Sequence, residues 1–218
     1  MDMKAILSGK NNDMYKRGPH TSILIYRKRK VVGRLLCGIN PQMKIEEGKT
    51  TGYFSLFEAE DENVGKELLA AAEKWFSENG ADIVVGPWSP DDGEGWRGFL
   101  IEGRDGPPIL MNAYTKEWYP SFFEKQGFEK YMDIYALKLD INKINHDKLT
   151  RLAAASKEKS GYIAESVDMS RVYEEAKDFY DVLVKSYPPE WEALLPSYEY
   201  VLGFIKAIKS IVDPDLIS

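Results

Sequence analysis

The sequence predicts an α/β fold of the mixed (α+β) kind: a mostly antiparallel, twisted sheet flanked by helices, followed by a C-terminal helical segment. Three observations support this expectation. Two apolar runs separated by basic residues, Ser22 to Arg27 and Val31 to Ile39, predict a β-hairpin. The stretch from Gly52 to Pro87 has the order strand, helix, strand, which predicts a βαβ unit. Helical periodicity dominates the last third of the chain.

Residues 1 to 21 contain several glycines and asparagines and predict an irregular N-terminal arm. The hairpin follows, and its basic tip, Arg27 to Lys30 together with Arg34, is interpreted as a solvated turn. Asn40 to Lys49 is polar and predicts a loop. Three consecutive strands are therefore expected before the first long helix.

The central βαβ unit begins with an aromatic and apolar strand from Gly52 to Glu58. Apolar residues then recur at helical spacing, namely at Val64, Leu68, Leu69, Ala72, Trp75 and Phe76. Asp61 or Asn63 can cap the start of this helix, and Gly80 can end it in a left-handed conformation. Asp82 to Gly86 predicts a short buried strand. The helix start beside the first strand is a natural anion site.

The chain after Pro87 is rich in glycine and proline and predicts loops, with a brief strand at Ile109 to Met111. Trp118, Tyr119, Phe122 and Phe123 share one face of a short helix that ends at Gly127. The nearly continuous apolar run from Tyr131 to Leu139 predicts a further strand.

The C-terminal part predicts a helix at about Asp147 to Lys159 and a weaker strand at Tyr162 to Val167. The strongest helical periodicity of the chain runs from Val172 to Tyr187 and stops at Pro188-Pro189. A last helix is expected from about Ser197 to Val212.

Composition excludes several classes of function. The formal charge of −6 argues against a nucleic-acid partner, which needs a clustered basic surface. No apolar run is long enough to span a membrane, and no signal sequence follows Met1, so we expect a cytoplasmic protein. Cys37 is the single cysteine and lies in an apolar run, which predicts a buried, inert thiol. No His, Cys and Asp cluster has metal spacing, so no metal is expected.

The order of these elements resembles the GNAT superfamily of N-acetyltransferases over about residues 20 to 140. The segments that carry the resemblance are GRLLCGINP, GYFSLFEAED, AAEKWFSENG, VVGPWSP, PPILMNAY and FFEKQGFEK, and they are most similar to a bacterial group of unassigned substrate. The resemblance implies that acetyl-CoA donates an acetyl group to a small-molecule or peptide amine by direct attack in a ternary complex. The alternative is a GNAT-fold binding or scaffold module that has lost the chemistry.

The resemblance also implies site residues. The backbone around Phe57 would hold the pantetheine arm, and the turn Asn63, Val64, Gly65 and Lys66 would hold the pyrophosphate of the coenzyme. Only Gly65 matches the family turn. Glu60 stands where a cation or an amide is expected, and a carboxylate there opposes a bound pyrophosphate.

The proton donor to the leaving thiolate is commonly a tyrosine, and Phe123 stands at that position. Tyr119, one helical turn earlier, can substitute for it, although packing in the core is the simpler interpretation of this aromatic residue. Glu58 at the end of the strand is the best-placed base for the amine, although a solvent-facing strand end is the simpler interpretation of this residue. Asn112 and Phe123 are further residues that could contact the coenzyme.

Two segments are expected: a GNAT-like acyl-CoA-binding core at residues 1–140, and a connector with a strand-helix-helix segment at residues 141–218. The second segment either completes the first domain or opens a truncated second repeat. Because helices with wide apolar faces cannot stay in water, we expect those after residue 170 to pack on the sheet. They could do so within one chain or by exchange in a homodimer.

Overall fold

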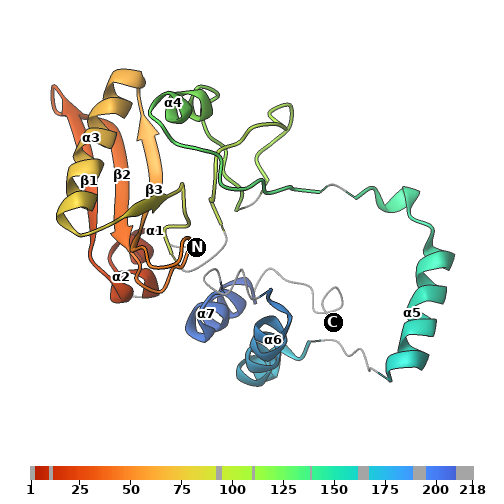
Figure 1. The fold of residues 1–218 in the computed structure, drawn as a ribbon. Helices are drawn as coiled ribbons and strands as arrows, with labels where there is room; N and C mark the ends of the chain where they lie inside the picture. Colours follow the sequence, from red (N-terminus) through yellow and green to blue (C-terminus); the bar gives the residue numbers. More distant parts are fainter. Residues whose placement is uncertain are drawn as a thin grey trace.

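The computed structural model of this chain describes residues 3–9, 12–91, 95–109, 111–137, 139–161, 167–188 and 195–209. Its sheet has four strands in the order of the sequence: β1 (His20–Arg27), β2 (Lys30–Ile39), β3 (Thr51–Ala59) and β4 (Ile83–Val85). β1, β2 and β3 pair antiparallel, whereas β3 and β4 pair parallel. The mixed α+β fold expected from the sequence is confirmed (Figure 1).

Seven helices accompany the sheet in the described residues: α1 (Met3–Leu7), α2 (Asp13–Arg17), α3 (Glu62–Glu78), α4 (Tyr119–Lys125), α5 (His146–Ser160), α6 (Val172–Ser186) and α7 (Tyr198–Ile208). Two short 3-10 turns, η1 (Ile141–Lys143) and η2 (Met169–Arg171), precede α5 and α6. The predicted N-terminal arm is therefore not irregular throughout, since it contains α1 and α2. The side chain of Asn12 caps α2 by accepting a hydrogen bond from the Met14 amide.

The long helix α3 forms as the sequence predicts. Of the two predicted caps, Asp61 is the one used, and its carboxylate accepts the Val64 amide at 2.9 Å. Gly80 has a φ of +73°, the left-handed conformation expected after the helix end. α3 lies against the sheet (Figure 1), and its apolar residues form the main core with residues of β2 and β3.

The third strand is irregular where it leaves its neighbours. Arg34 pairs with Glu58 and Leu36 with Ser55, so β3 has one residue more than β2 between these pairs. This bulge places Leu56 at a φ of +54°, which is unusual for a residue with a side chain. The parallel pairing with β4 covers only Thr51 to Tyr53 of β3. The last residues of β3 are therefore splayed from β4.

The opposite face of the sheet carries a second, smaller core. Its buried members are Met14, Met43, Tyr53 and Trp88. They come from α2, the loop after β2, β3 and the turn after β4. Tyr187, which follows α6, also packs against this cluster. This face is thus covered mainly by loops and by a short helix.

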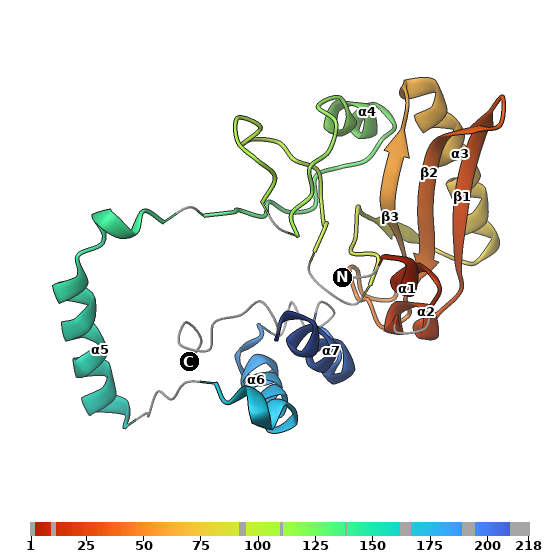
Figure 2. The same ribbon diagram turned by 180° about the vertical axis from the view of Figure 1, so that it is seen from behind.

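Within the single chain the C-terminal helices do not cover the sheet, and their exchange with a second copy stays a prediction. α6 and α7 lie side by side, and Ala176 and Val201 are buried there (Figures 1 and 2). Apart from Tyr187, they pack mainly on each other. α5 matches its predicted range, but it stands apart from the sheet and buries no residue.

Two predicted strands are wrong in the described residues. Tyr131 to Leu139, apart from the undescribed Lys138, forms no strand, because no other strand lies beside it to accept its hydrogen bonds. Ile109 and Met111 form no strand either, and Met111 has a φ of +64°, which is incompatible with one. Residues 162–166, which make up all but the last residue of the predicted strand at Tyr162 to Val167, lie outside the described residues, as does the end of the last helix beyond Lys209.

Candidate active site at the end of the third strand

The splayed end of β3 brings Glu58 and Tyr119 together. The hydroxyl of Tyr119 donates a hydrogen bond to Oε2 of Glu58 at 2.8 Å. The same hydroxyl accepts one from the amide of Ala59 at 3.0 Å. Tyr119 is fully buried, and its ring packs edge-on against Phe57 at 4.9 Å between centroids. The two residues predicted as catalytic are therefore in direct contact, although they are distant in the sequence.

The surroundings of Tyr119 keep its hydroxyl protonated. Burial raises the pKa of this hydroxyl well above its ordinary value of 10.0. The hydrogen bond from Ala59 opposes the shift, whereas the hydrogen bond to Glu58 and its negative charge add to it. Arg34, which pairs with Glu58 across the strands, also lowers the pKa. The Tyr119 hydroxyl is thus protonated at neutral pH and can donate a hydrogen bond.

A shallow cavity of about 330 Å³ lies beside this pair. Its walls include the backbone of β2 and β3, Glu58, and the basic residues Lys30, Arg34 and Lys116. Lys116 donates a hydrogen bond to the carbonyl of Ala59 at 2.5 Å. The amide and the carbonyl of Ala59 are thus both bonded to side chains of the segment that carries Lys116 and Tyr119.

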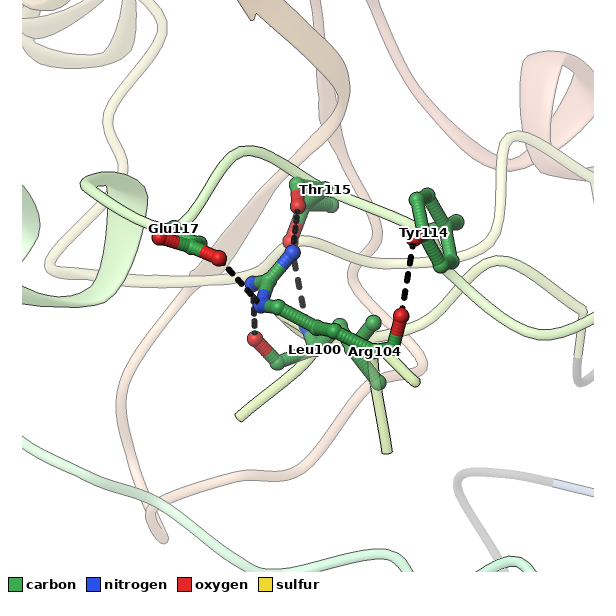
Figure 3. Close-up of polar contacts among 5 residues, drawn as sticks. All are labelled: Leu100, Arg104, Tyr114, Thr115 and Glu117. Carbon is green, nitrogen blue, oxygen red and sulfur yellow. Dashed lines mark hydrogen bonds and ion pairs between the residues drawn. The ribbon is translucent and has the colours of Figure 1, made fainter. Parts of the chain in front are cut away.

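Arg104 stabilises the loop that carries Lys116 and leads into α4 (Figure 3). Its guanidinium donates hydrogen bonds to the carbonyls of Leu100 at 2.6 Å and of Thr115 at 2.5 Å. It also lies 3.9 Å from a carboxylate oxygen of Glu117. The amide of Leu100 donates to the hydroxyl of Thr115. One arginine therefore joins both ends of the loop immediately before Lys116 and Tyr119.

The turn at the start of α3 does not fit a diphosphate as it stands. The Asp61 carboxylate already occupies the Val64 amide. Gly65 is covered by α4, because a Cβ built there would lie 2.7 Å from the ring of Phe122. Glu60 and Glu62 bring further negative charge, although Lys30 and Lys125 lie 3.5 Å from them. These exposed ion pairs offset the charge only weakly.

The other predicted coenzyme contacts lie elsewhere. Phe123 is buried and stacks on Phe54 at 5.2 Å between centroids, so it belongs to the core. Phe57 is likewise buried among aromatic rings. Asn63 is exposed beside the Asp61 cap, and Lys66 lines a groove farther along α3. Asn112 is exposed in a turn, where its amide donates to the Ile109 carbonyl.

Sequence reasoning missed three contributors: the Ala59 backbone, Lys116 and Arg104. The pairing of Arg34 with Glu58 lies beside the bulge in β3, which the sequence does not predict. The contacts of Lys116 and Arg104 could not be predicted either, because both depend on the path of a loop without periodicity.

Two negative findings concern the described residues only. They contain no group of three His, Cys, Asp or Glu side chains placed to hold a metal ion. Within the same residues, each helix is too short or too polar to cross a bilayer.

Comparison with known proteins gives two curated relatives. The chain is 32% identical over 134 residues to Protein YghO of Escherichia coli (strain K12), a match that covers 58% of this chain and 34% of that protein. It is 27% identical over 225 residues to a bacterial ceramide synthase of Caulobacter vibrioides (strain NA1000 / CB15N), covering 100% of this chain and 56% of that protein. The chain thus spans about a third and just over half of the length of these relatives. No protein-family model matches it.

Several solved structures are similar to this chain in structure, with low sequence identity. They include a putative acetyl transferase from Pyrococcus furiosus, with a TM-score of 0.38 and 17% identity, covering 58% of this chain and 70% of that one. A Trypanosoma brucei acetyltransferase has a TM-score of 0.36 and 16% identity, with 58% and 74% coverage. A transcriptional regulator from Bacillus halodurans C-125 has a TM-score of 0.38 and 13% identity, with 64% and 77% coverage.

The strand order and the mixed pairing, in which only the first residues of β3 lie beside β4, agree with the GNAT-like fold that the sequence resembles.

Proposed function

We propose that the chain carries an N-acyltransferase site in which Glu58 and Tyr119 handle the protons. The observation that carries this proposal is the hydrogen bond from the buried Tyr119 to Glu58 at the bulged end of β3. An acyl transfer to an amine needs a group that accepts a proton from the amine and a group that supplies one to the leaving atom. A carboxylate and a protonated tyrosine in direct contact provide both.

The residues would act as a relay. Glu58 accepts a proton from the acceptor amine as the amine attacks the acyl carbon, and the Tyr119 hydroxyl gives its proton to the leaving sulfur. The hydrogen bond between them returns the proton from Glu58 to Tyr119. The amide of Ala59 holds the tyrosine oxygen in place throughout. An activated acyl donor supplies the acyl group itself.

The relatives support the class of reaction. A ceramide is an N-acylated long-chain amine, so the name of the Caulobacter relative describes the formation of an amide. This chain covers 56% of that protein. For this chain we therefore propose only the chemical class of each substrate, namely an amine as the acceptor and an acyl thioester as the donor. Acetyl-CoA is the simplest donor to test, and we propose the cytoplasm as the site of action.

The rival function is a GNAT-fold binding module without chemistry. Two observations favour it: the capped turn at the start of α3, and Phe123 in place of the usual tyrosine. The two functions differ in whether a thiol is released when the protein meets a thioester and an amine.

The test is thiol release from acetyl-CoA and from a long-chain acyl-CoA, each with a panel of amines. Glu58→Gln keeps a carbonyl oxygen for Tyr119 but cannot accept a proton. We expect it to lower the rate by about 10² to 10⁴-fold with little change in thermal stability. Glu78→Gln, at the far end of α3 in an exposed ion pair with Lys74, is the matched control and should keep the wild-type rate. Equal rates in both variants would remove Glu58 from the reaction, and no release by the wild type would favour the binding module.

A further inference from the structure

The segment from Tyr131 to Leu139 leaves its apolar side chains in water. The exposed fractions are 54% for Tyr131, 38% for Met132, 64% for Ile134, 79% for Tyr135, 92% for Leu137 and 74% for Leu139. Soluble proteins seldom expose so many large apolar residues together unless a partner covers them. The sequence of this segment also has the β-branched, aromatic and aliphatic composition of a strand. It therefore lacks a sheet edge to join.

Such an edge and an adjoining apolar groove exist on the same molecule. β4 is the last strand in the order of the sheet, so one of its edges carries no described neighbour. A groove of about 810 Å³ runs between β4, α3 and the chain after α4. Its apolar wall includes Leu35, Phe54, Leu69, Phe76, Val84 and Phe128. An unpaired strand edge beside an apolar groove is a template for strand addition.

The chain approaches this groove and then leaves it. Phe128 packs against Phe54 at 5.8 Å and Phe123 at 5.1 Å between ring centroids. The residues after it lead away from the sheet toward α5 in both views (Figures 1 and 2). α5 is equally without cover, with Leu149 and Leu152 exposed by 52% and 56%. Residues 131–160 thus form an extended arm, and the groove that would suit its first part is left open.

We propose that the arm is exchanged between two copies of this chain, so that Tyr131–Leu139 of each copy joins the β4 edge and the groove of the other. An exposed arm and an open groove on one molecule can form a closed interface with two-fold symmetry, because the arm of each copy can occupy the groove of the other. The exchange uses the arm rather than α6 and α7, which already pack on each other.

The area is sufficient for a stable dimer. A fully covered aromatic side chain buries roughly 150–250 Å², and the two exchanged segments contribute four tyrosines. Met132, Ile134, Leu137 and Leu139 of each copy add aliphatic surface. The sum lies in the range of roughly 1,200–2,000 Å² that specific interfaces bury. The proposal does not depend on the acyltransferase function.

The test is the oligomeric state of the full chain by light scattering across a concentration series, with Ile134→Asp and Ile101→Asp as a matched pair. Ile134 is 64% exposed in the arm, and Ile101 is 66% exposed in a loop outside it. We expect a wild-type dimer. Ile134→Asp should raise its dissociation constant about tenfold or more, because the interface would bury a charge, whereas Ile101→Asp should leave it unchanged. A monomeric wild type, or equal effects of the two variants, would overturn the proposal.

A second variant tests the groove. Ala70→Trp fills the groove wall from an exposed position on α3 and leaves the core untouched. It should weaken the dimer as Ile134→Asp does. Hydrogen exchange completes the test, because amides of residues 132–137 should be protected in the dimer and exchange rapidly in Ile134→Asp. Protection of these amides in a monomer would mean that the arm folds back on its own chain, which contradicts exchange.

Discussion

The packed half of the molecule, residues 20–128, and the arm, residues 131–160, have similar shares of apolar residues. The apolar side chains are largely buried in the packed half, whereas many of those in the arm are exposed. In the first, Leu68, Phe122 and Tyr119 are completely buried. In the second, Tyr135 and Leu137 are among the most exposed apolar side chains of the described chain. The difference lies in partners: α3 and α4 supply a second layer to the sheet, whereas no described element faces the arm. Apolar composition predicts the tendency to be buried, and the arrangement of partners decides whether burial occurs.

The largest effect should come from emptying the aromatic core. Phe122→Ala removes a ring that is 0% exposed and lies directly on Gly65, so it should cost about 3–5 kcal/mol of unfolding free energy. Tyr135→Ala in the arm should change stability by less than about 0.5 kcal/mol at concentrations where the chain is monomeric. Urea denaturation measures both. A cost for Tyr135→Ala as large as that for Phe122→Ala would break the contrast between the two regions.

A smaller effect is expected at Tyr119. Tyr119→Phe leaves the buried Ala59 amide without its acceptor, which should cost about 1–3 kcal/mol. The loss of the hydroxyl should therefore lower stability in addition to any effect on the proposed reaction. Tyr135→Phe, at an exposed tyrosine, is the control and should cost nothing measurable.

The stability of Tyr119→Phe should also depend on pH differently from that of the wild type. Burial raises the pKa of folded Tyr119, whereas the unfolded tyrosine ionises near its ordinary value of about 10. The stability linked to this group is therefore complete below about pH 10 and is lost as the pH rises above it. Tyr119→Phe should lose less stability than the wild type between neutral pH and pH 11. Parallel curves for the two proteins would show that Tyr119 ionises as freely in the folded state as in the unfolded state.

The smallest effect should appear on the surface of the packed half itself. Lys74 and Glu78 form an exposed pair one turn apart on α3, with side chains 77% and 61% exposed. Lys74→Ala should change the unfolding free energy by about 0.5 kcal/mol or less. A double-mutant cycle with Glu78→Ala isolates the pair. A coupling free energy well above that value would show that an exposed pair in the packed half contributes to stability without being buried.

The sequence by itself determined the elements whose patterns are local. The hairpin, α3 with its Asp61 cap and Gly80 stop, and α5 follow from periodicity and capping chemistry, because the interactions that form them span only a few residues. Glu58 and Tyr119 could be named from position and resemblance, since each lies at the end of such an element.

Only the tertiary structure decided how these elements are used. It placed the Tyr119 hydroxyl between Ala59 and Glu58, brought Phe122 onto Gly65, and joined the loop before Lys116 through Arg104. It also left the strand-like run from Tyr131 to Leu139 without a neighbour. A strand satisfies its backbone through another strand rather than through itself, so its sequence can state a preference for pairing but cannot supply the partner.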